Sequence, residues 1–217
     1  MARAKNVTGR QRLVEKILEL KKGAVRGIVD SRIKEFGDYK KKSGEGLFSE
    51  LCFCITTANC AAESCIRIQQ EIGGGYSTFS EEKLSSKLKG LGYRFPNKRA
   101  SYIVAARKHR DAFVEKIKKG AGGKEMREWL VENVKGLGYK EASHFLRNIG
   151  YSDEAIIDFH IVDILVRHGI IEKPGTLTKK KYLEIEKALS GLAAETCLTL
   201  AELDLYLWYM ETGKVLK

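Results

Sequence analysis

Asp158 is the residue whose type and setting point most directly to chemistry. An apolar run, Ala155-Ile156-Ile157, stops at this carboxylate, and a helical pattern begins directly after it. An aspartate at a helix N-cap is held ionised by backbone amides and by the helix dipole. It can therefore stabilise a cation that forms in a site, although a capping aspartate without a chemical role is the commoner case. Lys140 stands eighteen residues earlier, at the expected start of another helix, and we interpret the two residues as a catalytic pair.

The segment before Lys140 predicts a phosphate-binding hairpin. Gly136 and Gly138 bracket Leu137 between two helical patterns, and glycine permits both a tight turn and a close approach of the backbone to a ligand. The amides of this turn would lie at the positive end of the following helix, where phosphate is favoured. Leu137 would pack inside the hairpin, and Lys135 would add a charge contact. An ordinary helical hairpin is the alternative, because two glycines at this spacing are common.

The elements that must position these residues are all predicted to be helices. Apolar residues recur at helical spacing along nearly the whole chain, and no alternating strand pattern is found. We therefore predict an all-α fold. The predicted helices cover residues 13–22, 48–70 (as one helix or two abutting helices), 81–89, 97–119, 124–134, 140–149, 159–169, 178–189 and 193–210.

The composition favours a polyanionic partner. Lys and Arg number 39 and Asp and Glu number 28, so the net charge is +11. Basic proteins bind nucleic acid favourably because neutralised phosphates release counterions, whereas a lysine surplus that only keeps the chain soluble is the alternative. The basic start, residues 1–10, lacks the apolar run of a secretory signal, and no segment predicts a membrane span. We expect a cytoplasmic location without a targeting signal.

The cysteines and histidines give no metal-binding pattern. Cys52, Cys54, Cys60 and Cys65 crowd into one apolar helical stretch, Cys197 stands alone, and none shows paired C-x-x-C spacing. We expect all five to be small buried hydrophobes rather than disulfides or ligands. The four histidines are scattered, and we expect them to be solvated or satisfied in the core. No metal and no cofactor are predicted.

One five-residue sequence, Lys-Gly-Leu-Gly-Tyr, occurs twice, at 89–93 and at 135–139. Each copy is flanked by helical patterns. Two copies with different flanks do not make a repeat architecture. We therefore predict two similar hairpin turns.

Taken together, the hairpin and the aspartate turn resemble the helix-hairpin-helix family of DNA glycosylases. The family's G-x-G-x-K hairpin and its later apolar-x-x-Asp turn match Gly136, Gly138, Lys140 and Asp158. Other branches of the family usually have a proline before the aspartate, where this chain has two isoleucines.

A more specific resemblance is to the archaeal-type 8-oxoguanine DNA glycosylase/lyases, and it spans nearly the whole chain. It implies two helical lobes that flank a DNA-binding cleft. Residues 1–217 would form a single glycosylase unit, with the hairpin and the aspartate turn at about 129–168. The segments that carry this resemblance are 50–54, 56–59, 202–209 and 213–217.

The resemblance implies a bifunctional DNA repair enzyme. Deprotonated Lys140 would attack the anomeric carbon of the damaged nucleotide and expel 8-oxoguanine, and β-elimination from the resulting Schiff base would nick the strand. Asp158 would stabilise the charge on the sugar and assist proton transfer. The partner would be double-stranded DNA containing 8-oxoguanine, bound by a nucleoid-associated monomer.

The damaged nucleotide must leave the duplex to reach the lysine, and the resemblance names side chains that would receive it. Phe95 and Trp208 would stack on the base, and Lys217 would bind its altered edge. Asn59 would fill the gap left in the duplex. Two alternatives stay open: an endonuclease-III-like enzyme for oxidised pyrimidines, and a non-catalytic helix-hairpin-helix DNA-binding protein.

Overall fold

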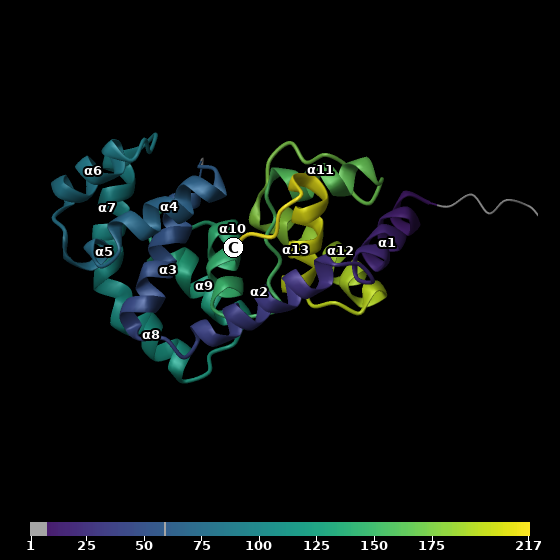
Figure 1. Cartoon of the computed structure of the whole chain (residues 1–217), viewed down its shortest axis with the longest axis horizontal. Coiled ribbons are helices and arrows are strands. Elements are labelled where there is room, and N and C mark those ends of the chain that lie inside the picture. Colours follow the sequence, from purple (N-terminus) through teal and green to yellow (C-terminus); the bar gives the residue numbers. More distant parts are fainter. Residues whose placement is uncertain (1–7, 59) are drawn as a thin grey trace, which may run out of the picture. The chain divides into compact units, whose positions relative to one another are not determined.

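The computed structural model describes residues 8–58 and 60–217, and throughout these ranges the chain forms helices joined by loops, without a β-strand. The all-α prediction is confirmed. The chain divides into two compact units (Figure 1). We call residues 34–154 together with Lys217 the hairpin unit, and the described residues up to 33 together with 155–216 the aspartate unit. Helix α2 (Val25–Tyr39) contains the boundary between them.

The hairpin unit is built around α3 (Gly44–Thr57), whose residues 47–57 are buried apart from Ser49. Helices α4, α7, α8 and α10 pack against it. Phe113 of α8 and Phe145 of α10 meet edge to face, with ring centroids 5.9 Å apart. The other helices of the unit are α4 (Ala62–Ile72), α5 (Gly75–Thr78), α6 (Glu81–Gly90), α7 (Pro96–Ala106), the 3-10 helix η1 (Arg107–His109), α8 (Arg110–Lys118), α9 (Gly123–Asn133) and α10 (Tyr139–Asn148).

The aspartate unit packs the first helix of the chain against the last two. Helix α1 contacts α12 and α13, and α11 contacts α13. Leu13 and Ile17 of α1 are fully buried, and Leu203 of α13 is 1 % exposed. Thr8 and Gln11 form a capping box at the start of α1, which satisfies two helix-end amides. The helices are α1 (Gly9–Leu20), α11 (Phe159–Arg167), α12 (Lys179–Thr196) and α13 (Leu200–Thr212).

Most predicted helices are confirmed, but α2 was not predicted. Two interior glycines, Gly27 and Gly37, weaken the helical signal, because each costs about 1 kcal/mol relative to alanine. Burial of Val29 and Phe36 outweighs that cost. The segment 48–70 forms two helices, α3 and α4, which is one of the two predicted outcomes.

The predicted break between the last two helices was placed wrongly. Ser190 and Gly191 continue α12 without interruption, and the helix ends at Thr196. Cys197 there adopts a left-handed conformation with φ 50°, and Thr199 then caps α13 through a capping box. Cys197 is also exposed and Cys60 is half-buried, so the prediction of five buried cysteines holds for Cys52, Cys54 and Cys65 alone.

The two copies of Lys-Gly-Leu-Gly-Tyr do not form similar turns, which corrects that prediction. In the first copy α6 runs through Gly90, and the positive φ of 79° falls on Gly92 just after the helix. In the second copy the preceding helix ends at Asn133, and the positive φ of 91° falls on Gly136, the earlier of the two glycines. The flanking helices, rather than the five residues themselves, decide which glycine bends the chain.

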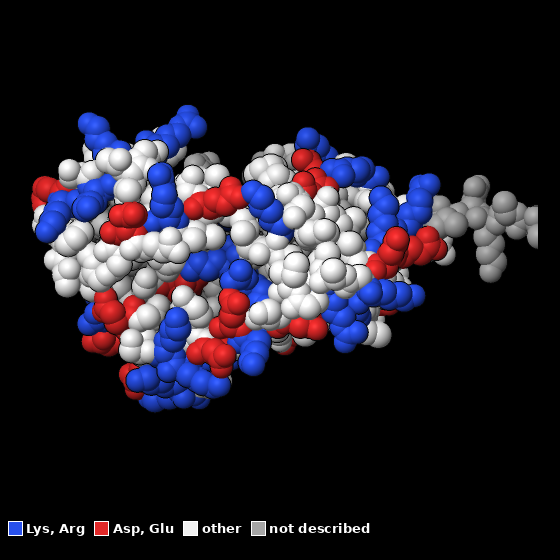
Figure 2. Space-filling model, in the orientation of Figure 1, with Lys and Arg blue, Asp and Glu red and all other residues white. Residues whose placement is uncertain are grey.

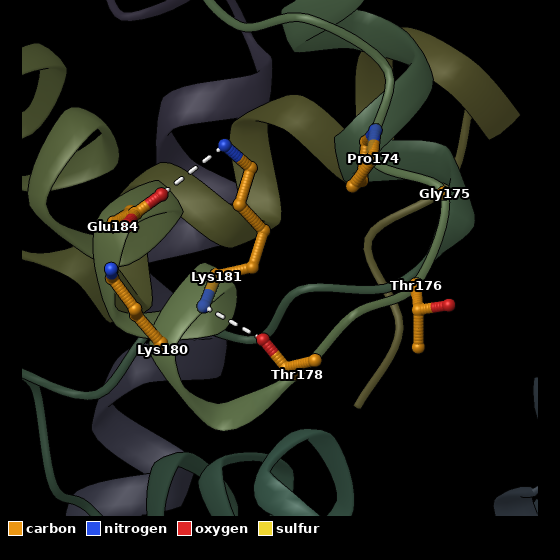
Figure 3. A pocket seen from close by; sticks show the side chains of 7 residues that line it. All are labelled: Pro174, Gly175, Thr176, Thr178, Lys180, Lys181 and Glu184. Carbon is orange, nitrogen blue, oxygen red and sulfur yellow. Dashed lines mark hydrogen bonds and ion pairs between the residues drawn. The ribbon is translucent and has the colours of Figure 1, made fainter.

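A pocket of about 330 Å³ lies at the N-terminal end of α12. Figure 3 shows Lys181 among the residues that line it, with its ammonium paired to Glu184 and its amide bonded to the Thr178 hydroxyl. None of the predicted site residues lines this pocket. Among the described residues, no helix is long and apolar enough to cross a membrane.

Candidate active site

The hairpin between α9 and α10 depends on a glycine at position 136. Its φ of 91° is disfavoured for every residue with a Cβ, and a Cβ there would lie 2.2 Å from the Tyr102 ring. Leu137 is buried in the core beneath the turn, as predicted. Lys135 is exposed, with its ammonium 5.6 Å from the centre of the Tyr102 ring.

Buried polar contacts hold the two legs of the hairpin together. The Arg127 guanidinium of α9 is 2 % exposed, donates to the Ser143 hydroxyl of α10 at 3.2 Å, and lies 5.2 Å from the centre of the Tyr139 ring. The Tyr139 hydroxyl in turn bonds to the Glu128 carboxylate. These contacts fix the start of α10 relative to α9 and therefore orient the residues of its first turn.

The amide of Gly138 has a partner in this structure. Gly138 precedes α10, is exposed, and donates its N–H to the Glu141 carboxylate at 3.2 Å. A carboxylate at this place indicates that the helix start favours negative charge. An external phosphate bound to the same amide would have to displace Glu141.

Lys140 is the second residue of α10 and is half-buried. Within the hairpin unit, no carboxylate of the described residues lies at ion-pair distance from its ammonium, in contrast to the paired lysines at 41, 116, 119 and 217. The amine is therefore not committed to a structural ion pair in its own unit.

His144 lies one helical turn after Lys140 on the same face of α10, and it is buried. Burial lowers the pKa of His144 well below its usual range, and the nearby charges of Arg147, Lys140 and Lys217 lower it further. The backbone of Lys217 acts in the opposite direction. Neither ring nitrogen makes a hydrogen bond of normal geometry to a described residue, although the Lys217 backbone lies close enough to act on the pKa of the ring.

Asp158 is the N-cap of α11, as predicted. Its Oδ1 accepts a hydrogen bond from the Ile161 amide at 3.0 Å, and its backbone conformation is extended. The side chain is half-buried. One carboxylate oxygen therefore serves the helix end, which holds the group in a fixed orientation.

The turn before Asp158 is held by two side chains of α12 that sequence analysis missed. The Tyr182 hydroxyl donates to the Ala155 carbonyl at 2.7 Å and accepts from the Ile157 amide at 3.2 Å. The Glu186 carboxylate accepts from the Ala155 amide at 2.9 Å. These bonds fix the backbone of the segment in which other branches usually have a proline. No sequence pattern indicates this pairing, because the partners lie 25 to 31 positions apart.

Trp208 belongs to a chain of three aromatic rings in the aspartate unit. The Trp208 and His160 rings are nearly perpendicular with centroids 5.0 Å apart, and the His160 and Phe159 rings have centroids 3.9 Å apart. Phe159 is 69 % exposed, an unusual setting for a large apolar side chain. Sequence analysis named Trp208 but missed both residues that follow Asp158, although their position next to the carboxylate was a signal.

Phe95 is the N-cap residue of α7 and is 39 % exposed. The Arg94 guanidinium lies 5.0 Å from the centre of its ring. A half-exposed ring next to an arginine can stack on a base. The prediction for Asn59 concerns a residue outside the described ranges.

Lys217 packs into the hairpin unit rather than fraying. Its ammonium donates to Glu50 Oε2 at 2.8 Å and to Gln69 Oε1 at 2.5 Å, and it lies 4.3 Å from the centre of the Phe53 ring. Glu50 also helps to raise the pKa of the neighbouring Tyr39 to about 12, although burial of the phenol is the larger cause. The buried Glu50 carboxylate therefore interacts with both Lys217 and Tyr39.

Basic and acidic side chains alternate over much of the surface drawn in Figure 2, and a larger basic group lies near the end of α8. Lys116 of α8 and Lys119, the residue after this helix, are paired with Glu125 and Glu115. Acidic partners therefore offset part of the positive charge at the end of α8.

Comparisons with known proteins identify close relatives. The family described as 8-oxoguanine DNA glycosylase matches residues 29–198. The 8-oxoguanine DNA glycosylase/AP lyase of Methanocaldococcus jannaschii is 53 % identical over 206 residues, which cover 94 % of this chain and 99 % of that protein. The protein of the same description from Korarchaeum cryptofilum is 51 % identical over 206 residues, with 94 % and 98 % covered.

Two solved structures are also similar. The M. jannaschii 8-oxoguanine glycosylase/lyase in complex with a 15mer DNA containing 8-oxoguanine matches with a TM-score of 0.92 and 53 % identity, over 95 % of this chain and 100 % of that one. The 8-oxoguanine DNA glycosylase of Thermotoga maritima matches with a TM-score of 0.91 and 40 % identity, over 96 % and 100 %.

Proposed function

The chain belongs to the 8-oxoguanine DNA glycosylase family, and on this basis we propose that Lys140 and Asp158 carry out its chemistry. The protein is an 8-oxoguanine DNA glycosylase and AP lyase that acts in base-excision repair. The observation that best supports the proposal is the setting of Lys140, half-exposed in the first turn after the hairpin and unpaired with any described carboxylate of its unit. Family membership favours this function over an oxidised-pyrimidine glycosylase and over a non-catalytic DNA-binding protein.

In the proposed reaction, the lone pair of the Lys140 amine forms a bond to C1′ of the damaged nucleotide. The bond from C1′ to the base breaks, and its electron pair leaves with the base, which takes up a proton. The nitrogen then loses a proton, the C1′–O4′ bond breaks with its electron pair left on O4′, which takes up a proton, and nitrogen and C1′ form a protonated Schiff base. Loss of a proton from C2′ then expels the 3′ phosphate group, which breaks the strand. Asp158 provides fixed negative charge opposite the positive charge that develops on the sugar.

We propose that the hairpin binds the DNA backbone through the amides of Gly136 and Gly138, with Lys135 as a charge contact. Binding of a phosphate at Gly138 would replace the Glu141 carboxylate that its amide now bonds. Glu141→Gln should therefore tighten DNA binding, because a neutral side chain competes less with phosphate for the helix end. An unchanged or weaker affinity would contradict a phosphate at Gly138.

We propose base contacts for Phe95, Trp208 and Lys217, and a gap-filling role for Asn59. The exposure of the Phe95 ring supports stacking on an extruded base, and the edge-to-face contact with His160 would hold the Trp208 ring in place for such a contact. We also propose that a monomer acts on double-stranded DNA at the nucleoid. A sedimentation measurement of the free protein and of its DNA complex tests the stoichiometry.

The deciding experiment traps the Schiff base. The protein is incubated with a duplex that carries one 8-oxoguanine, borohydride is added, and the covalent complex is measured. We expect an adduct with the native protein, loss of the adduct with Lys140→Gln, and retention with the matched control Lys135→Gln. No adduct with the native protein would refute the lysine mechanism, and an adduct with Lys140→Gln would identify another nucleophile.

The substitution Asp158→Asn tests the negative charge of Asp158 separately from its role as the N-cap of α11. Asparagine caps a helix about as well as aspartate, so the melting temperature should change little. Base excision should fall by about 100-fold or more, because the fixed charge is lost. Full turnover by Asp158→Asn would remove Asp158 from the mechanism.

A further inference from the structure

The ammonium of Lys217 occupies a pocket that is built for one positive charge. Glu50 accepts its hydrogen bond at 2.8 Å and Gln69 at 2.5 Å. The Lys217 side chain is 15 % exposed and the Glu50 side chain 0 %. The Phe53 ring, 4.3 Å from the ammonium, covers one side. A cation in this setting is held by charge, hydrogen bonds and an aromatic face together.

Every polar partner of the pocket is itself oriented by a neighbour. Asn148 donates to Glu50 Oε1 at 2.7 Å, and its own oxygen accepts from the Arg147 guanidinium at 3.0 and 2.9 Å. The Gln69 amide nitrogen donates to Glu50 Oε2 at 3.1 Å and to the Ser49 carbonyl at 3.1 Å, which turns the amide oxygen toward Lys217. The buried carboxylate therefore has defined partners on both of its oxygens.

A buried carboxylate without a cation is strongly disfavoured, so Glu50 and the Lys217 ammonium stabilise each other in place. It follows that the ammonium is committed to Glu50 and Gln69. The ammonium of Lys217 is therefore not free to bind another ligand. What the pocket supplies is a fixed position for the residue.

The same face of α10 carries Lys140, His144 and Asn148 at intervals of four residues. Asn148 binds Glu50, and the backbone of Lys217 influences His144. The pocket that holds Lys217 is thus built on the helix that presents the proposed nucleophile. Helix α10 therefore helps to position both residue 217 and Lys140.

We propose that Glu50, supported by Gln69 and Asn148, is a positioning residue for base excision: it fixes Lys217 beside the helix of Lys140, and this placement is required for removal of 8-oxoguanine but not for the lyase step on an abasic site. The inference rests on the proposed function, in which Lys217 contacts the base. Glu50 acts through Lys217 and does not touch DNA in this scheme.

The test uses two DNA probes, because an abasic site has no base to excise and reports the lyase step alone. Glu50→Gln keeps the shape of the side chain and removes its charge. We expect excision from a duplex containing 8-oxoguanine to fall by about tenfold or more, which is the effect of about 1.4 kcal/mol in the transition state. Borohydride trapping on a duplex with a preformed abasic site should stay within about twofold of the native rate.

Lys217→Met should reproduce both results, and the double variant should be no worse than either single variant, because both remove one interaction. The matched control is Glu184→Gln, which breaks the exposed Lys181–Glu184 pair of Figure 3 and should leave both rates unchanged. If Glu50→Gln does not fold, Lys217→Met alone decides the question.

Native excision of 8-oxoguanine by Lys217→Met, or by a folded Glu50→Gln, would overturn the inference. So would an equal loss on the abasic probe, which would indicate a general structural role. Failure of the native protein to trap either probe would refute the proposed lysine chemistry instead. The two failures are therefore distinguishable.

Discussion

The substitution Gly136→Ala tests the hairpin most sharply. Residue 136 has φ 91°, and an added Cβ would lie 2.2 Å from Cδ2 and 2.7 Å from Cε2 of the Tyr102 ring. Two separate penalties are therefore expected: one from the left-handed backbone, and one from displacement of a packed aromatic ring.

The first copy of the five-residue sequence offers a matched control. Gly92 has φ 79°, but a Cβ there would meet no atom within 4 Å. Gly92→Ala should therefore cost about 1–2 kcal/mol of unfolding free energy from backbone strain alone. Gly136→Ala adds a steric cost of about 1–3 kcal/mol, for a total of about 2–5 kcal/mol. Effects of alanine on the unfolded chain are the same in both copies and cancel in the comparison.

Urea denaturation of the two variants measures both values, and Tyr102→Ala supplies the second control. In a Tyr102→Ala background, Gly136→Ala should cost no more than Gly92→Ala costs in the native protein. DNA affinity should fall with Gly136→Ala and stay native with Gly92→Ala. Equal destabilisation by the two glycine substitutions, or no rescue by Tyr102→Ala, would refute the contact between Gly136 and Tyr102 as the reason for glycine.

Three further predictions concern stability and positioning. Tyr182→Phe leaves the Ala155 carbonyl and the Ile157 amide without their buried partner, so the unfolding free energy should fall by about 1–3 kcal/mol. Excision of the base should fall more than DNA affinity, and native excision would contradict the role of this hydroxyl. Because the pKa of buried His144 is depressed, the unfolded chain accepts a proton below about pH 6.5 that the folded protein does not. The unfolding free energy should therefore fall as the pH is lowered below that value, by up to about 1.4 kcal/mol per pH unit. His144→Phe should remove that part of the loss in denaturation curves at about pH 5 and about pH 7, and an unchanged difference would contradict a neutral ring. Thr199→Ala removes the side-chain cap of α13 and should lower the melting temperature by the equivalent of about 1 kcal/mol, an effect that Thr199→Asp should not show.

The features that sequence analysis predicted correctly are local. Gly136, Leu137 and Gly138 define a turn by their own types, and Asp158 caps the helix that directly follows it. Periodicity gave the helical fold for the same reason, since each amphipathic segment carries its own pattern.

The features that it missed depend on distant partners. Gly191 looks like a helix end, but α12 continues because Leu189, Leu192 and Ala193 are buried. The bonds from Tyr182 to the aspartate turn and from Glu50 to Lys217 join residues 25 to 167 positions apart. No local pattern contains such pairs, so the support of each candidate residue had to come from the structure.

The aspartate turn has a consequence for how related sequences should vary. A proline fixes its backbone covalently, whereas here the Tyr182 hydroxyl and the Glu186 carboxylate fix the segment before Asp158 from another helix. The two solutions make each other unnecessary. Across an alignment of the wider superfamily, the tyrosine and a proline before the aspartate should therefore exclude one another, and the position of Tyr182 should co-vary with the turn rather than with the substrate.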